Sequence, residues 1–164
     1  KSLPFILKLK SDLKLIIIGS GNEMYNLKQL SKKLGVFENI DFLSNLEHHK
    51  AMSIIKSSKI FIQLSTSEGG GSIAVNEAHA CGLPVVAVKH PQGIDLELIE
   101  NGRTGIWLNK PDPELLAREV FKLLNDQNYK KMDQFIINSK DCIEWTSIAR
   151  KLEDLIIKIL TPKK

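Results

Sequence analysis

Short apolar runs alternate with amphipathic stretches along the chain, and this alternation limits its possible folds more than any other feature. The apolar runs are rich in Val, Ile and Leu, which favours buried strands, whereas apolar residues spaced three and four apart favour helices. Strands are expected over residues 13–18, 40–43, 60–64, 85–88 and 106–108. Helices are expected over residues 3–9, 24–34, 48–57, 72–80, 96–99, 113–124, 129–137 and 145–160. Such alternation predicts an α/β fold, with right-handed βαβ units and a parallel sheet between helices.

The composition is that of one folded domain. Of the 164 residues, 43% are hydrophobic and 26% are charged, which is enough apolar material for a core. No apolar run approaches the roughly 20 residues that a membrane-spanning helix needs. Lys1 is not an initiator Met, and the chain opens directly on a helical pattern. We therefore expect residues 1–164 to be a single domain of a longer protein.

The charge and the cysteines argue against nucleic acid, disulfides and a metal. The net charge of +4 comes from dispersed lysines without the interleaved aromatic residues of a nucleic-acid platform. Cys81 and Cys142 make no framework, and His48 and His49, adjacent on a helix, point in different directions and cannot hold one ion. We expect these two histidines to be surface residues, His79 to be structural, and the protein to be cytoplasmic with no metal or cofactor.

The most informative stretch joins the expected strand 60–64 to the expected helix 72–80. It places an acid and three glycines at residues 68–71, and glycines let the backbone approach a ligand without a Cβ in the way. Ligands of such sheets bind outside the carboxyl ends of the strands, so this junction is a candidate site. Ser72 is expected to cap the helix, whose free N–H groups suit a pyrophosphate.

Two carboxylates lie on either side of the start of this helix. Glu77, inside the helix, can accept hydrogen bonds from ribose hydroxyls, and Glu68, on the preceding loop, is placed for sugar hydroxyls. Each also has an ordinary alternative: Glu77 as a solvated helix residue, and Glu68 as a partner of the helix dipole. The junction as a whole predicts a site that holds a phosphorylated sugar.

This stretch resembles the donor site of the glycosyltransferase 4 type, the retaining glycosyltransferases with a GT-B fold. Residues 77–86, Glu-Ala-His-Ala-Cys-Gly-Leu-Pro-Val-Val, match the second half of the family motif. Glu68 and Glu77 are separated by one residue more than the two acids of the family. Other segments that fall in the family order are 13–21, 40–44, 97–105 and 145–149.

The resemblance implies a Rossmann-like parallel sheet with helices on both faces, forming the C-terminal half of a GT-B enzyme. The enzyme would transfer a hexose from a UDP- or GDP-linked donor to a glycan or lipid-linked acceptor, as in polysaccharide biosynthesis, with retention and without a metal. An N-terminal domain outside this chain would hold the acceptor, and the whole protein would work in the cytoplasm or at the inner membrane face. The chain alone is expected to bind the donor and to be inactive.

The resemblance also assigns roles to individual residues. Glu68 and Lys1 would be catalytic, Lys1 being the lysine that neutralises the donor diphosphate, with Ser2 in place of the usual glycine. Donor binding would fall to Gly19, Gly21, Ser44, Asn45, Gly69, Gly70, Gly71, Ser72, Ile73 and Glu77. The helix at 145–160 has one apolar face, which is expected to pack partly on the other domain.

Three alternatives stay open. Gly19 and Gly21 could form a plain strand-to-helix turn, since Met24 stands where a dinucleotide fingerprint has its third glycine. The enzyme could be a sugar-nucleotide 2-epimerase, which has a related two-domain fold but needs acid and base residues lining the sugar. The domain could also be a non-catalytic module that binds a nucleotide sugar.

Overall fold

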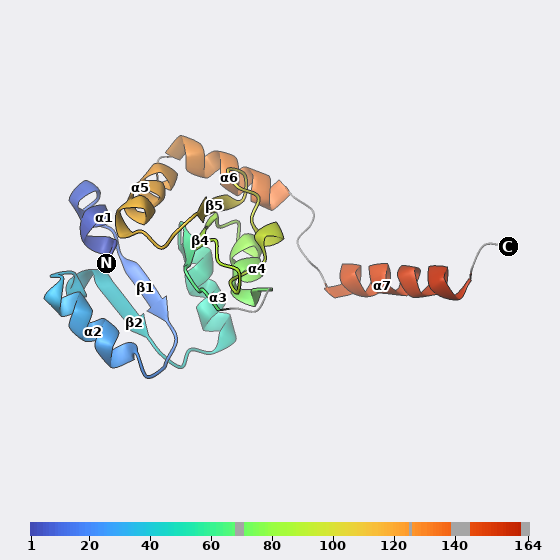
Figure 1. Cartoon of the computed structure of the whole chain (residues 1–164), viewed down its shortest axis with the longest axis horizontal. Helices are drawn as coiled ribbons and strands as arrows, with labels where there is room; N and C mark the ends of the chain where they lie inside the picture. The colour runs from blue at the N-terminus through green and yellow to red at the C-terminus, as the bar shows by residue number, and fades with distance from the viewer. Residues whose placement is uncertain (68–70, 125, 139–144, 162–164) are drawn as a thin grey trace.

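The computed structural model describes residues 1–67, 71–124, 126–138 and 145–161 (Figure 1). Its strands are all parallel and hydrogen-bond in two groups. In the first group β1 (Leu15–Ile18) pairs with β2 (Ile40–Leu43). In the second, β4 (Val85–Val88) lies between β3 (Phe61–Gln63) and β5 (Gly105–Leu108). The predicted α/β fold class is confirmed, and the division of the strands into two hydrogen-bonded groups is a feature that the sequence pattern did not indicate.

The helices fall where the apolar periodicity predicted them, to within a few residues at each end. The α-helices are α1 (Leu3–Leu9), α2 (Met24–Lys33), α3 (His48–Ser57), α4 (Ile73–Ala80), α5 (Pro113–Leu123), α6 (Asp126–Asn138) and α7 (Trp145–Leu160). Two short 3-10 helices are η1 (Phe37–Asn39) and η2 (Leu96–Leu98). Among the described residues, no helix combines the length and the apolar character that crossing a membrane requires.

The core lies on both faces of β4, whose four residues are all buried. Val86 and Val88 belong to one apolar cluster, with buried side chains of α1, α5 and α6. Val85 and Ala87 belong to a second cluster, with buried side chains of α3 and α4. Side chains alternate between the two faces of a strand, so an uninterrupted apolar run serves both clusters. Burying each valine stabilises the fold by roughly 1.5 to 3 kcal/mol.

Two helix ends show why the elements begin and stop where they do. Asp112 precedes α5, and its Oδ1 accepts hydrogen bonds of 3.0 Å from the N–H groups of Glu114 and Leu115, which confirms the expected cap. Gly35 ends α2 in the left-handed region, at φ +67°. Its N–H donates to the carbonyl of Lys32, so a carbonyl of the last turn is satisfied.

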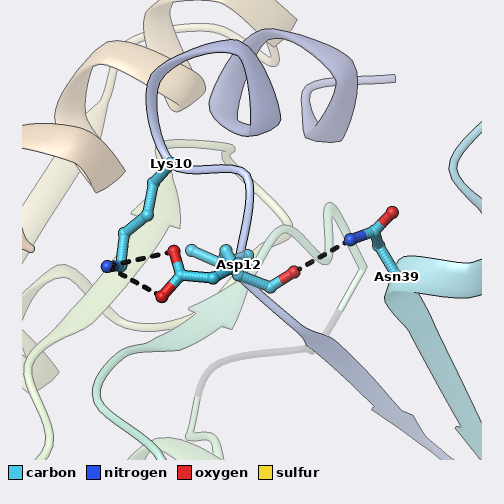
Figure 2. A network of polar contacts seen from close by, with 4 residues as sticks. Lys10, Asp12 and Asn39 are labelled. Carbon is cyan, nitrogen blue, oxygen red and sulfur yellow. Dashed lines mark hydrogen bonds and ion pairs between the residues drawn. The ribbon is translucent and has the colours of Figure 1, made fainter.

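Figure 2 shows the polar contacts where the chain enters β1. The Lys10 ammonium lies 3.2 Å from Asp12 Oδ1, and Asn39 Nδ2 donates a 3.3 Å hydrogen bond to the carbonyl of Leu13. The hydrogen bond from Lys10 lowers the pKa of Asp12 from its ordinary value. The bond between Asn39 and Leu13 joins the turns that lead into β1 and β2, at the amino ends of the strands and opposite the expected site.

A cavity of about 910 Å³ lies between the two strand groups. β1 lines it with Ile16 and Ile18, and the other side includes Phe61 and Ile62 of β3. Ile16 and Ile18 are 36% and 38% exposed, so the first strand group is less deeply buried than β4. The lining of this cavity is therefore largely apolar. The charged residues in it, Glu77 and several lysines, are the candidates for binding a polar ligand.

Candidate functional site

The first turn of α4 lies at the carboxyl end of β3, as the sequence predicted. Ser72 occupies the N-cap position with extended backbone angles, and its side chain is 3% exposed. The expected side-chain cap is wrong, because Ser72 makes no capping hydrogen bond with its side chain. Instead, its carbonyl accepts the N–H of Asn76 at 3.3 Å. The N–H groups at the start of α4 thus keep their capacity to bind an anion.

Glu77 and Lys1 line the same cavity, although they come from opposite ends of the first half of the chain. Glu77 is half-buried, with 27% of its side chain exposed. Ala74 of the first turn of α4 and Leu64 of the loop after β3 also line the cavity, as do Lys10, Lys14 and Lys59. The lining of this one cavity therefore includes cations, a carboxylate and a residue from the first turn of a helix.

Other predicted site residues lie at the same ends of the strands without lining this cavity. Gly19 follows β1, and its N–H donates a 2.9 Å hydrogen bond to the carbonyl of Leu43. A Cβ built at Gly19 or Gly21 would meet no atom within 4 Å, so this turn borders open space. Asn45, which follows Ser44 after β2, has a left-handed backbone with φ +53°.

The loop between β3 and α4 is described only in part. Gly71 is exposed, and Ile73 is 78% exposed at the first position of α4. Glu68, Gly69 and Gly70 lie outside the described residues, and so does Cys142.

His48 is a neighbour of Glu77 that the sequence did not reveal. It is the first residue of α3, and its Nδ1 lies 3.6 Å from Glu77 Oε1. Consecutive crossover helices on one sheet face lie side by side, but the sequence does not say which residues meet. His79 turns elsewhere: its Nε2 lies 3.2 Å from the carbonyl of Thr104, and burial lowers the pKa of its imidazole.

The described residues contain no group of three or more His, Cys, Asp or Glu side chains that could hold a metal ion. Cys81 follows α4 and is partly buried. Burial raises the pKa of its thiol, which keeps it protonated and weakly nucleophilic at neutral pH.

The chain belongs to the family described as Glycosyl transferases group 1, whose model matches residues 1–141. Over 124 residues it is 33% identical to an uncharacterised glycosyltransferase of Methanocaldococcus jannaschii, covering 76% of this chain and 31% of that protein. Over 132 residues it is 30% identical to the GDP-mannose-dependent monoacylated alpha-(1-6)-phosphatidylinositol monomannoside mannosyltransferase of Corynebacterium glutamicum, covering 77% and 33%. The chain thus spans about a third of the length of these curated relatives.

A solved structure shares the fold. The pneumococcal O-GlcNAc transferase GtfA, determined with UDP and GlcNAc, superposes with a TM-score of 0.81 at 20% identity. The match covers 97% of this chain and 32% of that chain. The resemblance read from residues 77–86 is thereby confirmed at the level of the glycosyltransferase family and the fold.

Proposed function

We propose that residues 1–164 form the donor-binding, C-terminal half of a retaining glycosyltransferase of the glycosyltransferase 4 type. The observation that carries this proposal is one cavity whose lining includes Lys1, Glu77 and Ala74 of the first turn of α4. The donor is a hexose linked to UDP or GDP, and the product is a glycosylated glycan or lipid-linked acceptor.

The site must bind a nucleotide sugar and stabilise its diphosphate as this group leaves. A helix N-terminus attracts anions, and the side chain of Ser72 leaves the first turn of α4 uncapped. Lys1 adds a positive charge at the same cavity. Groups held in place before the reaction can stabilise the developing charge without a metal. We therefore propose Lys1 as the residue that neutralises the diphosphate.

The two carboxylates are proposed to bind different sugars of the donor, Glu77 the ribose and Glu68 the transferred hexose. Glu77 is half-buried and lines the cavity, so its oxygens can accept hydrogen bonds from ribose hydroxyls. Glu68, on the loop before α4, is proposed to contact the transferred hexose. The turns at Gly19 and Asn45, which follow β1 and β2, are proposed to face the nucleotide.

The relatives support the donor class and a second domain. The corynebacterial relative is named for GDP-mannose and a phosphatidylinositol mannoside, and the pneumococcal structure holds UDP. Because the chain spans about a third of its curated relatives, we propose an N-terminal domain that holds the acceptor. The apolar face of α7 is proposed to pack on that domain, in a cytoplasmic protein that works at the inner membrane face. The chain alone is expected to transfer no sugar, because the acceptor must be held beside the donor.

Titration calorimetry on the full-length protein tests the donor site with UDP-glucose and GDP-mannose. Glu77→Ala is expected to weaken binding of the preferred donor by about 1.5 to 3 kcal/mol, roughly one to two decades in affinity. Glu68→Ala should weaken it less, because its spacing departs from the family motif. Glu38→Ala is the control, since Glu38 is exposed in η1 at the opposite edge of the strands and should bind as wild type does.

Two results would count against the proposal. A folded Glu77→Ala protein that binds the donor as tightly as wild type would remove the ribose assignment. A product assay that finds an isomerised sugar nucleotide, and no sugar on an acceptor, would replace transfer with epimerisation.

A further inference from the structure

The pair formed by His48 and Glu77 joins two helices at the candidate site. His48 begins α3, and its Nδ1 lies 3.6 Å from Oε1 of Glu77 on α4. The two helices pack on the same face of β4, where Ile55 of α3 and Val75 of α4 belong to one buried cluster. Core packing therefore places the start of α3 beside α4.

The two partners differ in their exposure to solvent. The His48 side chain is 75% exposed, whereas only 27% of the Glu77 side chain is exposed. The half-buried carboxylate lines the cavity that we assign to the donor. His48 thus lies beside a carboxylate that lines this cavity.

The adjacent His49 contacts a different carboxylate, that of Glu47. Its Nε2 lies 3.5 Å from Oε2 of Glu47, and the Lys50 ammonium lies 3.2 Å from the same oxygen. The charges of both Lys56 and Glu77 act on Cys81, and Lys1, Lys10, Lys14 and Lys59 line the cavity together with Glu77. His48 lies 3.6 Å from the Glu77 carboxylate.

We propose that protonated His48 is a positioning residue for Glu77 and makes donor binding depend on pH. At 3.6 Å the contact is longer than a hydrogen bond, so its attraction requires the charged imidazolium. The ion pair holds Oε1 and leaves Oε2 to accept from a ribose hydroxyl. When His48 loses its proton the carboxylate loses this restraint, and the donor binds less tightly.

This inference rests on the proposed function, because it assumes that Glu77 binds the ribose. The test is calorimetry on the full-length protein with UDP-glucose and GDP-mannose at about pH 6 and about pH 8. The diphosphate of a nucleotide sugar keeps its charge over this interval, so the ligand does not add a titration of its own. Wild type should bind the preferred donor roughly two- to fivefold more tightly at the lower pH, the range expected of an exposed ion pair.

Three variants separate positioning from a merely structural role. His48→Gln should bind at both pH values with the weaker affinity that wild type shows at about pH 8. His48→Lys keeps a cation at this place and should restore tight binding at both pH values. His49→Gln is the matched control, an exposed histidine one residue along that faces Glu47, and it should keep the profile of the wild type.

The outcomes distinguish this inference from the function on which it rests. If Glu77→Ala binds the donor as wild type does, the ribose assignment fails and the inference fails with it. If Glu77→Ala weakens binding but His48→Gln keeps the pH profile of the wild type, the role of His48 alone is overturned. A flat profile in wild type also overturns it.

Discussion

Helices α5 and α7 are both amphipathic, yet one buries its apolar face and the other does not. Leu116, Val120 and Leu123 of α5 are 6%, 4% and 1% exposed. Leu155 and Ile156 of α7 are 54% and 47% exposed. Figure 1 shows α5 packed over the strands and α7 standing apart from them. An apolar face with regular spacing therefore predicts that a helix needs a partner, but it does not say whether the same chain supplies that partner.

The largest expected effect is on the α5 side of this comparison. Leu123→Ala removes a side chain that is 1% exposed in the cluster with Val86 and Val88. It should lower the free energy of unfolding of the chain by about 2 to 5 kcal/mol, because a cavity remains in a packed core. Urea denaturation followed by circular dichroism measures the loss. A change as small as that of an exposed leucine would show that α5 does not depend on this cluster.

A smaller effect is expected at the start of α5, where Asp112 caps the helix. Hydrogen bonds from backbone N–H groups, that of Leu115 first, lower the pKa of Asp112 below its ordinary 3.8. Because the folded state holds the carboxylate, the cap stabilises the chain fully above that ordinary value and is lost as pH falls through the lowered pKa. Asp112→Ala should lower the Tm at neutral pH by less than Leu123→Ala does.

An isosteric variant isolates the charge of this cap. Asp112→Asn keeps an oxygen that can accept from the N–H groups of Glu114 and Leu115, but it does not titrate. The difference in Tm between wild type and Asp112→Asn should shrink as the pH is lowered through the acid range. A difference that stays constant with pH would contradict the link between the cap and its carboxylate.

The smallest effect is expected on the α7 side. Leu155→Ala should change the unfolding free energy of residues 1–164 by no more than about 0.5 kcal/mol, because its side chain is 54% exposed. In the full-length protein the same change should be more destabilising, if the proposed N-terminal domain covers this face. Chemical denaturation measures the effect in residues 1–164 and in the full-length protein. Equally small effects in both would contradict the packing of α7 on an N-terminal domain.

Much of the local structure followed from particular residues. Val85–Val88 was predicted as a strand because its apolar run consists mostly of β-branched residues, and it is the fully buried centre of its sheet. Asp112 before Pro113 predicted the start of α5, and Gly35 predicted the end of α2. At Ser72, however, residue type indicated a cap that the side chain does not make. A preference for capping is local, whereas the hydrogen bonds that a side chain makes depend on its surroundings in the fold.

The sequence by itself determined the order of strands and helices, the family, and the stretch around Glu77 as the candidate site. These depend on spacing, turn chemistry and motif, which are read along the chain. Only the tertiary structure brought Lys1 and Glu77 to one cavity, placed His48 beside Glu77, and separated β1 and β2 from the other strands. Contacts between distant residues depend on how helices pack on strands. The spacing of apolar residues shows which face of a helix is buried, but not which residues of two elements meet. The apolar face of α7 is a further example. Its pattern can be read from residues 145–160, but the surface that it packs on cannot.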